Sequence, residues 1–142
     1  MCMVAFLGTD AVLDTTAFSP DAPAFYVGRP SPHEHAVRTR FGASHVYVLG
    51  SHTGCGCGFG FGETYADEHV DPDEADSRRQ LADRLRTLVE AGHAAEVYVC
   101  WSGDEAAPPV RRLSLTPDAF LEPARIAEGD TIRLISASSA PA

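Results

Sequence analysis

Short apolar runs recur along the chain, and polar or glycine- and proline-rich stretches separate them. Six of these runs are rich in β-branched and aromatic residues or alternate apolar with polar positions, which is typical of strands. They are Met3–Gly8, Ala24–Val27, His45–Leu49, Ala95–Trp101, Val110–Leu115 and Thr131–Ser136. We expect Ala24–Val27 to be an edge strand, because the sequence Gly28-Arg29-Pro30 stops it immediately. Met3–Gly8 is apolar throughout, so we expect it to be buried on both faces.

One segment has the period of a helix. Its apolar stripe, at spacings i, i+4, i+7 and i+8, consists of Leu81, Leu85, Leu88 and Val89. Asp71 fits an N-cap, with Pro72 at the first helical position and Glu74 where a capping box would place it. Gly92 fits the left-handed residue that ends a helix. The arginines predicted on the solvated face of this helix are Arg78, Arg79, Arg84 and Arg86.

The order of these elements indicates the fold class. The helix lies between the strands His45–Leu49 and Ala95–Trp101, which predicts a right-handed crossover that joins parallel, paired strands. Shorter helical turns are predicted at His33–Phe41 and from Thr116-Pro117-Asp118. The sum is an α+β domain, a mixed β-sheet of about five or six strands with one main amphipathic helix. We expect residues 1–136 to form a single domain and the small-residue tail 137–142 to be disordered.

Charge and composition narrow the classes of function. The 142 residues carry a formal net charge of −9, which makes nucleic acid and anionic membranes poor partners. No apolar run approaches the length of a membrane span. The N-terminal MCMVAFLGTD has no basic leader and no small-residue cleavage site, so we expect a cytoplasmic protein rather than a secreted one. Its cysteines are then expected to be reduced, which favours metal binding, redox chemistry or burial over structural disulfides.

The most distinctive stretch is HVYVLGSHTGCGCGFGFG, residues 45–62, which begins as a strand and continues with glycine at every second position. We expect Ser51–Gly56 to form a turn and Cys57–Gly62 to form the second arm of a hairpin. In an extended arm the cysteines and phenylalanines would share one face, and the glycines would leave the other face bare. A bare face lets another backbone or a ligand approach closely.

Cys55 and Cys57 form a Cys-x-Cys pair, and two thiolates are good ligands for zinc or iron. In a straight strand, residues two apart are separated by roughly 6.6 Å, so chelation requires a bend. The flanking glycines allow that bend at low steric cost. His52 precedes Cys55 by three residues and would complete a three-ligand loop. Further ligands would have to come from Cys2 or Cys100, each of which adjoins a predicted strand.

Other readings of the same cysteines stay open. A bridge between Cys55 and Cys57 would be strained and labile, which would suit a thiol redox role. His52 or His45 could instead activate Cys55 as a nucleophile. The cysteines could also simply pack. Two other histidines, His33 and His35 in the His-Glu-His sequence, are predicted to be solvated on a proline-flanked loop.

Two segments resemble an uncharacterised family of small bacterial proteins. They are HVYVLGSHTGCGCGF at residues 45–59 and EVYVCWSGDE at residues 96–105, and the Met-Cys start is similar to that family as well. The GCGCGF core, residues 54–59, is the distinctive part. The resemblance implies a shared fold and a shared cysteine loop, and it implies no activity.

Two principal hypotheses follow, with a thiol redox enzyme as a third. The first is a metal-binding or thiol-containing domain centred on Cys55 and Cys57, in which case the sulfurs should converge within about 4 Å of a common point. The second is a non-catalytic structural or protein-interaction domain, with a protein partner or a second copy of the chain, in which the cysteines point apart into apolar surroundings.

Overall fold

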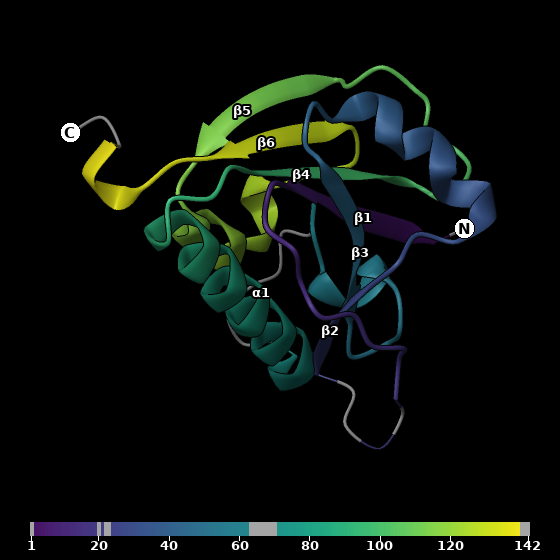
Figure 1. The fold of residues 1–142 in the computed structure, drawn as a ribbon. Helices are drawn as coiled ribbons and strands as arrows, with labels where there is room; N and C mark the ends of the chain where they lie inside the picture. The colour runs from purple at the N-terminus through teal and green to yellow at the C-terminus, as the bar shows by residue number, and fades with distance from the viewer. Residues whose placement is uncertain (1, 20, 22–23, 63–70, 140–142) are drawn as a thin grey trace.

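The computed structural model of the protein describes residues 2–19, 21, 24–62 and 71–139. Six strands form one mixed sheet in the order β2-β3-β1-β4-β6-β5 (Figure 1). Their bounds are Met3–Thr9 (β1), Phe25–Gly28 (β2), His45–Ser51 (β3), Ala95–Trp101 (β4), Arg111–Leu115 (β5) and Asp130–Leu134 (β6). The predicted α+β class and all six predicted strands are confirmed, with ends that differ by one or two residues. Among the described helices, none is long and apolar enough to cross a membrane.

The first strand, β1, lies in the middle of the sheet and pairs antiparallel with both β3 and β4. All seven of its residues are buried, as its continuous apolar sequence predicts. The prediction that His45–Leu49 and Ala95–Trp101 pair directly is therefore wrong. The two strands run in the same direction, but β1 lies between them. The backbone N–H and C=O groups of this buried strand are hydrogen-bonded along both of its edges, as burial requires. In the described part of the chain, the one parallel pair is β5 with β6.

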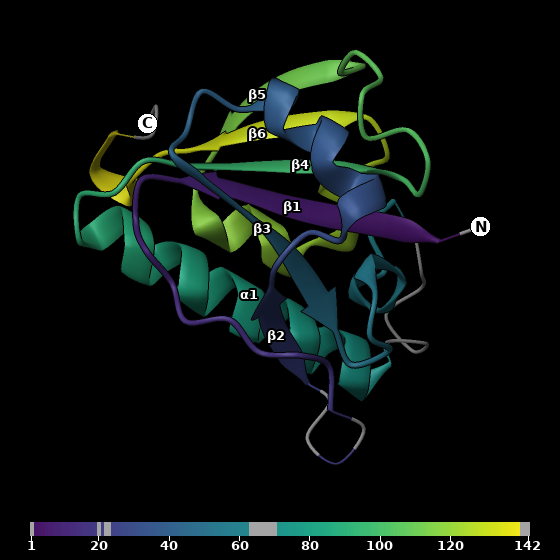
Figure 2. The same cartoon turned by 45° about the vertical axis from the view of Figure 1, so that its right-hand side comes forward.

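The main helix, α1 (Pro72–Glu90), packs on one face of the sheet. The 3-10 helix η1 (Pro32–Arg40) covers the opposite face (Figure 2). The predicted stripe of α1 is confirmed, since Leu81 and Leu85 are fully buried in the core. Asp71 caps the helix by accepting a hydrogen bond from the Asp73 N–H at 2.9 Å. Gly92 follows the helix with a φ of +86°, as predicted.

One arginine of α1 does not lie on the solvated face predicted for it. Arg78 was expected on the solvated face, but it is only 5% exposed. Its Nη1 donates to the carbonyl of Phe59 at 2.7 Å and lies 3.9 Å from a Glu74 carboxylate oxygen. Arg79, next to it, is exposed and pairs with Asp76, as expected of a solvated face. Arg78 therefore joins α1 to the glycine-rich loop.

The glycine-rich loop is not the second arm of a hairpin. Gly56–Phe59 form a 3-10 turn, η2, and Gly60 follows with a φ of +69°. The prediction of an extended Cys57–Gly62 segment is wrong, because the chain turns to bury the side chains of Phe59 and Phe61 in the core. Phe59 and Phe61 are buried and their rings stack at 5.2 Å, and Phe61 meets Phe120 at 6.0 Å. A turn anchored in the core thus replaces a strand at this point.

The C-terminal part contains the remaining short elements. The helical turn predicted from Thr116 is confirmed as η4 (Pro117–Leu121), and η5 (Pro123–Arg125) follows it. Both lie in the connection between the parallel strands β5 and β6. Within the predicted disordered tail, Ala137–Ser139 form a 3-10 turn (η6), and residues 140–142 lie outside the described residues.

Candidate metal centre

The loop that carries Cys55 begins where β3 ends. Ser51 fixes it through two hydrogen bonds to the Cys55 carbonyl, from its backbone N–H at 3.0 Å and from its hydroxyl at 2.5 Å. Gly54 turns the chain with a φ of +85°, which favours glycine. The Gly54 carbonyl accepts a hydrogen bond from the Tyr26 hydroxyl of β2 at 2.7 Å. The loop is therefore held to both β3 and β2.

The next residues of the loop lie against the start of β1. A Cβ atom at Gly56 would lie 2.8 Å from the Met3 carbonyl oxygen, so only glycine allows the two backbones to come this close. The sulfur of Cys57 accepts a hydrogen bond from the Met3 N–H at 3.1 Å. The bare glycine face expected from the sequence thus serves a close backbone approach, although in a turn rather than in a strand.

This contact brings three cysteines together. The sulfurs of Cys2, Cys55 and Cys57 all lie within 4.8 Å of one another. Cys2 directly precedes β1, and its carbonyl accepts a hydrogen bond from the Ser102 N–H at 2.7 Å, beyond the end of β4. All three cysteines are free thiols. Three thiols at this separation could hold a metal ion.

The other two candidate ligands lie elsewhere. His52 is half-buried, and its Nδ1 lies 3.0 Å from the Ser77 hydroxyl of α1. Cys100 is 1% exposed and belongs to the apolar cluster beneath η1, where it lies opposite Val4 in the β1–β4 pair. Within the described residues, no fourth histidine, cysteine or carboxylate atom joins the group of three sulfurs. Of the five candidates, the structure brings together Cys2, Cys55 and Cys57.

The environments of the thiols shift their pKa values in different directions. Burial acts to raise the pKa of Cys55, but hydrogen bonds from the Thr53 hydroxyl, the Cys57 backbone N–H and the neighbouring thiols outweigh it and lower that pKa. Burial raises the pKa of Cys57, and repulsion from a Cys55 thiolate adds to this. Burial, with the nearby carboxylates of Glu105 and Asp104, raises the pKa of Cys100 to about 12. Cys55 is therefore more easily ionised than Cys57 or Cys100.

Thiol labelling should reproduce this order. In the metal-free folded protein at neutral pH, we expect iodoacetamide to alkylate Cys55 faster than Cys57, because the thiolate is the reacting form. Cys100 should stay unmodified until the protein unfolds, since it is both buried and protonated. Mass spectrometry of peptides from native and urea-unfolded samples measures both effects. Labelling of Cys100 at the rate of Cys57 would contradict the structure.

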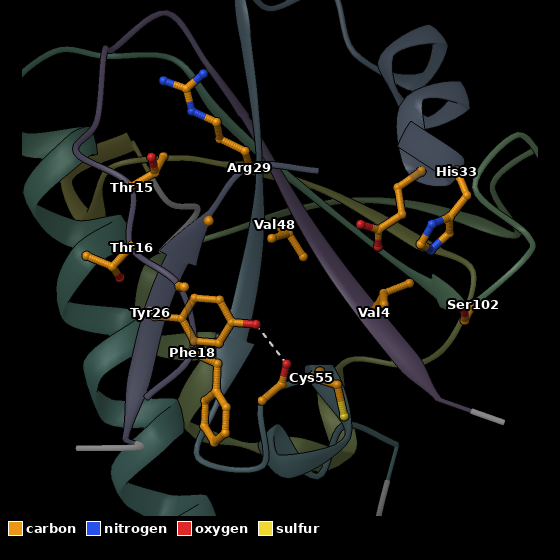
Figure 3. A pocket seen from close by; sticks show the side chains of 15 residues that line it. Val4, Thr15, Thr16, Phe18, Tyr26, Arg29, His33, Val48, Cys55 and Ser102 are labelled. Carbon is orange, nitrogen blue, oxygen red and sulfur yellow. Dashed lines mark hydrogen bonds between the residues drawn. The ribbon is translucent and has the colours of Figure 1, made fainter. Parts of the chain in front are cut away.

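A cavity of about 610 Å³ opens beside Cys55. Figure 3 shows Tyr26 and Phe18 on one side of it, His33 across from them, and Arg29 at the end away from Cys55. The carboxylate of Glu34 also lines the cavity and caps η1, accepting hydrogen bonds from the N–H and hydroxyl of Ser31. The thiol group thus lies at the edge of a space large enough for a small molecule.

Several residues that shape this site have no motif in the sequence. Arg78 and Met3 act through a side chain and a backbone N–H that only the fold brings to the loop. Thr53 could have been found from its position two residues before Cys55, where its hydroxyl lies 3.5 Å from the sulfur.

No protein-family model matches the chain, and neither a curated protein nor a solved structure matches it.

Proposed function

We propose that the protein is a cytoplasmic metal-binding domain that holds zinc or iron through the thiolates of Cys2, Cys55 and Cys57. The observation that carries the proposal is the convergence of three free sulfurs within 4.8 Å of one another. They come from two segments more than fifty positions apart in sequence, which the fold joins at the start of β1. A domain in which the cysteines merely pack gives no reason for such convergence.

The separation of the sulfurs suits a metal. Zinc–sulfur bonds of about 2.3 Å in a tetrahedral site imply sulfurs roughly 3.8 Å apart. A contraction of an ångström or less from the observed arrangement would meet this requirement, and Cys2 and Cys57 are exposed enough to move. Soft thiolate ligands favour zinc or iron over magnesium or calcium.

Three protein ligands would leave one tetrahedral position for water or another molecule, as in catalytic zinc sites. Cys55 lies on the wall of the 610 Å³ cavity, so that position could be reached from the cavity. We therefore favour a metal site that engages a small molecule over a closed structural site. The resemblance to a bacterial family with the same cysteine loop is compatible with this proposal and adds no activity to it.

Elemental analysis tests the proposal directly. The protein, purified without affinity tag or chelator under reducing conditions, is expected to contain about one zinc or iron per chain. Cys57→Ser should lose that metal and keep the fold, because Cys57 is exposed. Cys100→Ala is the matched control, because Cys100 lies outside the three-sulfur group and should leave the metal content unchanged.

Two results would overturn the proposal. One is a parent protein without zinc or iron that also fails to take up added metal after reduction. The other is a Cys57→Ser variant that keeps the metal content of the parent. Circular dichroism of each variant separates loss of metal from loss of fold.

A second candidate function is thiol redox chemistry, which the lowered pKa of Cys55 beside two further thiols favours. Oxidised glutathione would accept two electrons from two of the thiols, so that one disulfide forms in the protein and two glutathione thiols are released. Titration with glutathione buffers, followed by mass spectrometry, would identify the bridged pair. A metal-free protein with a reversible disulfide among Cys2, Cys55 and Cys57 would support this candidate instead.

A further inference from the structure

A second cavity, of about 500 Å³, lies on the η1 side of β3, at the end of the strand remote from the cysteines. Its wall comes from the segment before β2, from the residues after β2, from η1 and from the start of β3. The residues that line it are Val12, Leu13, Thr15, Arg29, Pro30, His35, Arg38, His45, Val46 and Tyr47. We call this space the basic cavity.

Apart from tyrosine, the ionisable side chains that line the basic cavity are all basic residues. Its titratable side chains other than tyrosine are two arginines and two histidines, Arg29, Arg38, His35 and His45. None of the described residues that line it is aspartate or glutamate. This is unexpected in a chain whose 20 acidic residues outnumber its 11 basic ones. Positive charge in a wall that itself carries no carboxylate attracts an anion even when the net charge of the protein is negative.

The two arginines are available for a ligand. Elsewhere in the protein, Arg79, Arg86 and Arg111 each pair with a carboxylate. Arg29 and Arg38 have no ion pair or side-chain hydrogen bond within the described part of the chain, and both are exposed. Arginine presents a fork of N–H donors that matches the oxygens of a phosphate or carboxylate group.

The arginines and histidines of the basic cavity come from different elements of the fold. Arg29 directly follows β2, and Figure 3 shows its guanidinium directed away from Cys55. Arg38 and His35 lie three residues apart on η1, which places them on one side of that helix, since side chains three apart eclipse in a 3-10 helix. His45 begins β3. Convergence of basic side chains from three elements is a property of the fold and not of one basic stretch of sequence.

From this arrangement we propose that the basic cavity binds the phosphate group of a small organic phosphoester. Arg29 and Arg38 form charge-assisted hydrogen bonds to the phosphate oxygens, and His35 and His45 lie beside them as further donors. The Thr15 hydroxyl offers an uncharged donor at the same wall. The site is separate from the three-thiol group, and it does not depend on whether a metal binds there.

The apolar part of the wall favours an organic ester over the free ion. Val12 is 80% exposed, and Leu13 and Val46 line the same cavity. An exposed valine beside a cationic pocket can make apolar contacts with the carbon skeleton of an ester, whereas inorganic phosphate has no apolar part to contact it. Thr15 and Arg29 line both cavities, so a ligand held by its phosphate here would have the cavity of Cys55 as its neighbour.

Binding of two probes to the full chain tests the proposal. At about pH 8, inorganic phosphate and phenyl phosphate both carry close to two negative charges, so they differ chiefly in the phenyl ring. In a titration followed by two-dimensional NMR, we expect saturable shifts confined to the amides of residues 12–15, 29–38 and 45–47. Phenyl phosphate should bind several-fold more tightly than inorganic phosphate.

Variants of the two arginines decide the outcome. Arg29→Gln and Arg38→Gln should each weaken phenyl phosphate binding about tenfold. Arg112→Gln removes an exposed arginine of β5, which is the edge strand on the opposite side of the sheet from β2 and does not line the basic cavity, and it should leave the affinity unchanged. Cys57→Ser should also bind as the parent does, so a failure of the metal proposal would not affect this one. The proposal would be overturned if all three arginine variants lost the same affinity for phenyl phosphate. It would also be overturned if the NMR shifts spread over the whole surface or did not saturate. Tighter binding of inorganic phosphate would overturn the ester specificity.

Discussion

Removal of the proposed metal by a chelator is expected to lower the free energy of unfolding by about 4 kcal/mol. A metal held as proposed would join Cys2 to Cys55 and Cys57, close a loop of roughly fifty residues and so reduce the conformational entropy of the unfolded chain. Stabilisation of this kind requires a ligand set that crosses from one segment to another, which the structure provides at β1 and the glycine-rich loop. Urea denaturation with and without a chelator measures the difference.

The same measurement on variants isolates the cause. Cys57→Ser should unfold at the same urea concentration with and without chelator, because it has already lost the metal. Cys100→Ala should be less stable than the parent, because the substitution leaves a small cavity in the cluster beneath η1. The chelator should nevertheless lower its free energy of unfolding by the same amount as in the parent. If the parent holds metal and the chelator does not change its midpoint, the metal does not bridge the two segments.

Arg78→Ala is expected to destabilise the protein by about 3 kcal/mol, a large effect for an arginine on a helix. The substitution leaves the Phe59 carbonyl without the donor that Arg78 Nη1 supplies at 2.7 Å, in a place where water has little access. It also removes a hydrogen bond between α1 and η2. Because η2 includes Cys57, a metal held as proposed should dissociate faster from this variant, which a competing chromogenic chelator can follow.

Arg79→Ala is the matched control for that experiment. Arg79 is the next residue of the same helix, and its pair with Asp76 is exposed to solvent. Such surface pairs contribute below about 1 kcal/mol, so the variant should unfold nearly as the parent does. Equal destabilisation by the two substitutions would show that the loss does not come from the hydrogen bond between Arg78 and η2, since alanine itself favours a helix at least as well as arginine.

Much of the fold follows from local pattern. β-branched and aromatic runs predicted all six strands, and the spacing of Leu81, Leu85 and Leu88 predicted α1. The order of strands could not be predicted, since the sequence does not say which strand lies beside β1.

The burial of Arg78 was missed for a different reason. Arg78 stands three residues before Leu81 and seven before Leu85, so its position belongs to the apolar stripe, and its charge led to the opposite prediction.

The cysteine site was predictable in part for similar reasons. The Cys-x-Cys sequence and its glycines indicated where chemistry would lie, but the third sulfur depends on the contact between Gly56 and Met3, which no local pattern encodes. His52 was chosen by spacing alone, and its ring instead lies against Ser77 of α1. Cys100 lies in the cluster covered by η1, and the alternation of faces along β4 could be assigned only once β1 was known to pair with it.

The close backbone contact between Gly56 and Met3 has a consequence for how the chain reaches its native state. Strands can pair in more than one alignment, and a shift of two residues keeps every side chain on its proper face while moving the strand by about 7 Å. A β1 strand misaligned by that amount would carry Cys2 away from Cys55 and Cys57. Only the native alignment would then capture the metal, so metal uptake would act as a proofreading step for the strand at the centre of the sheet.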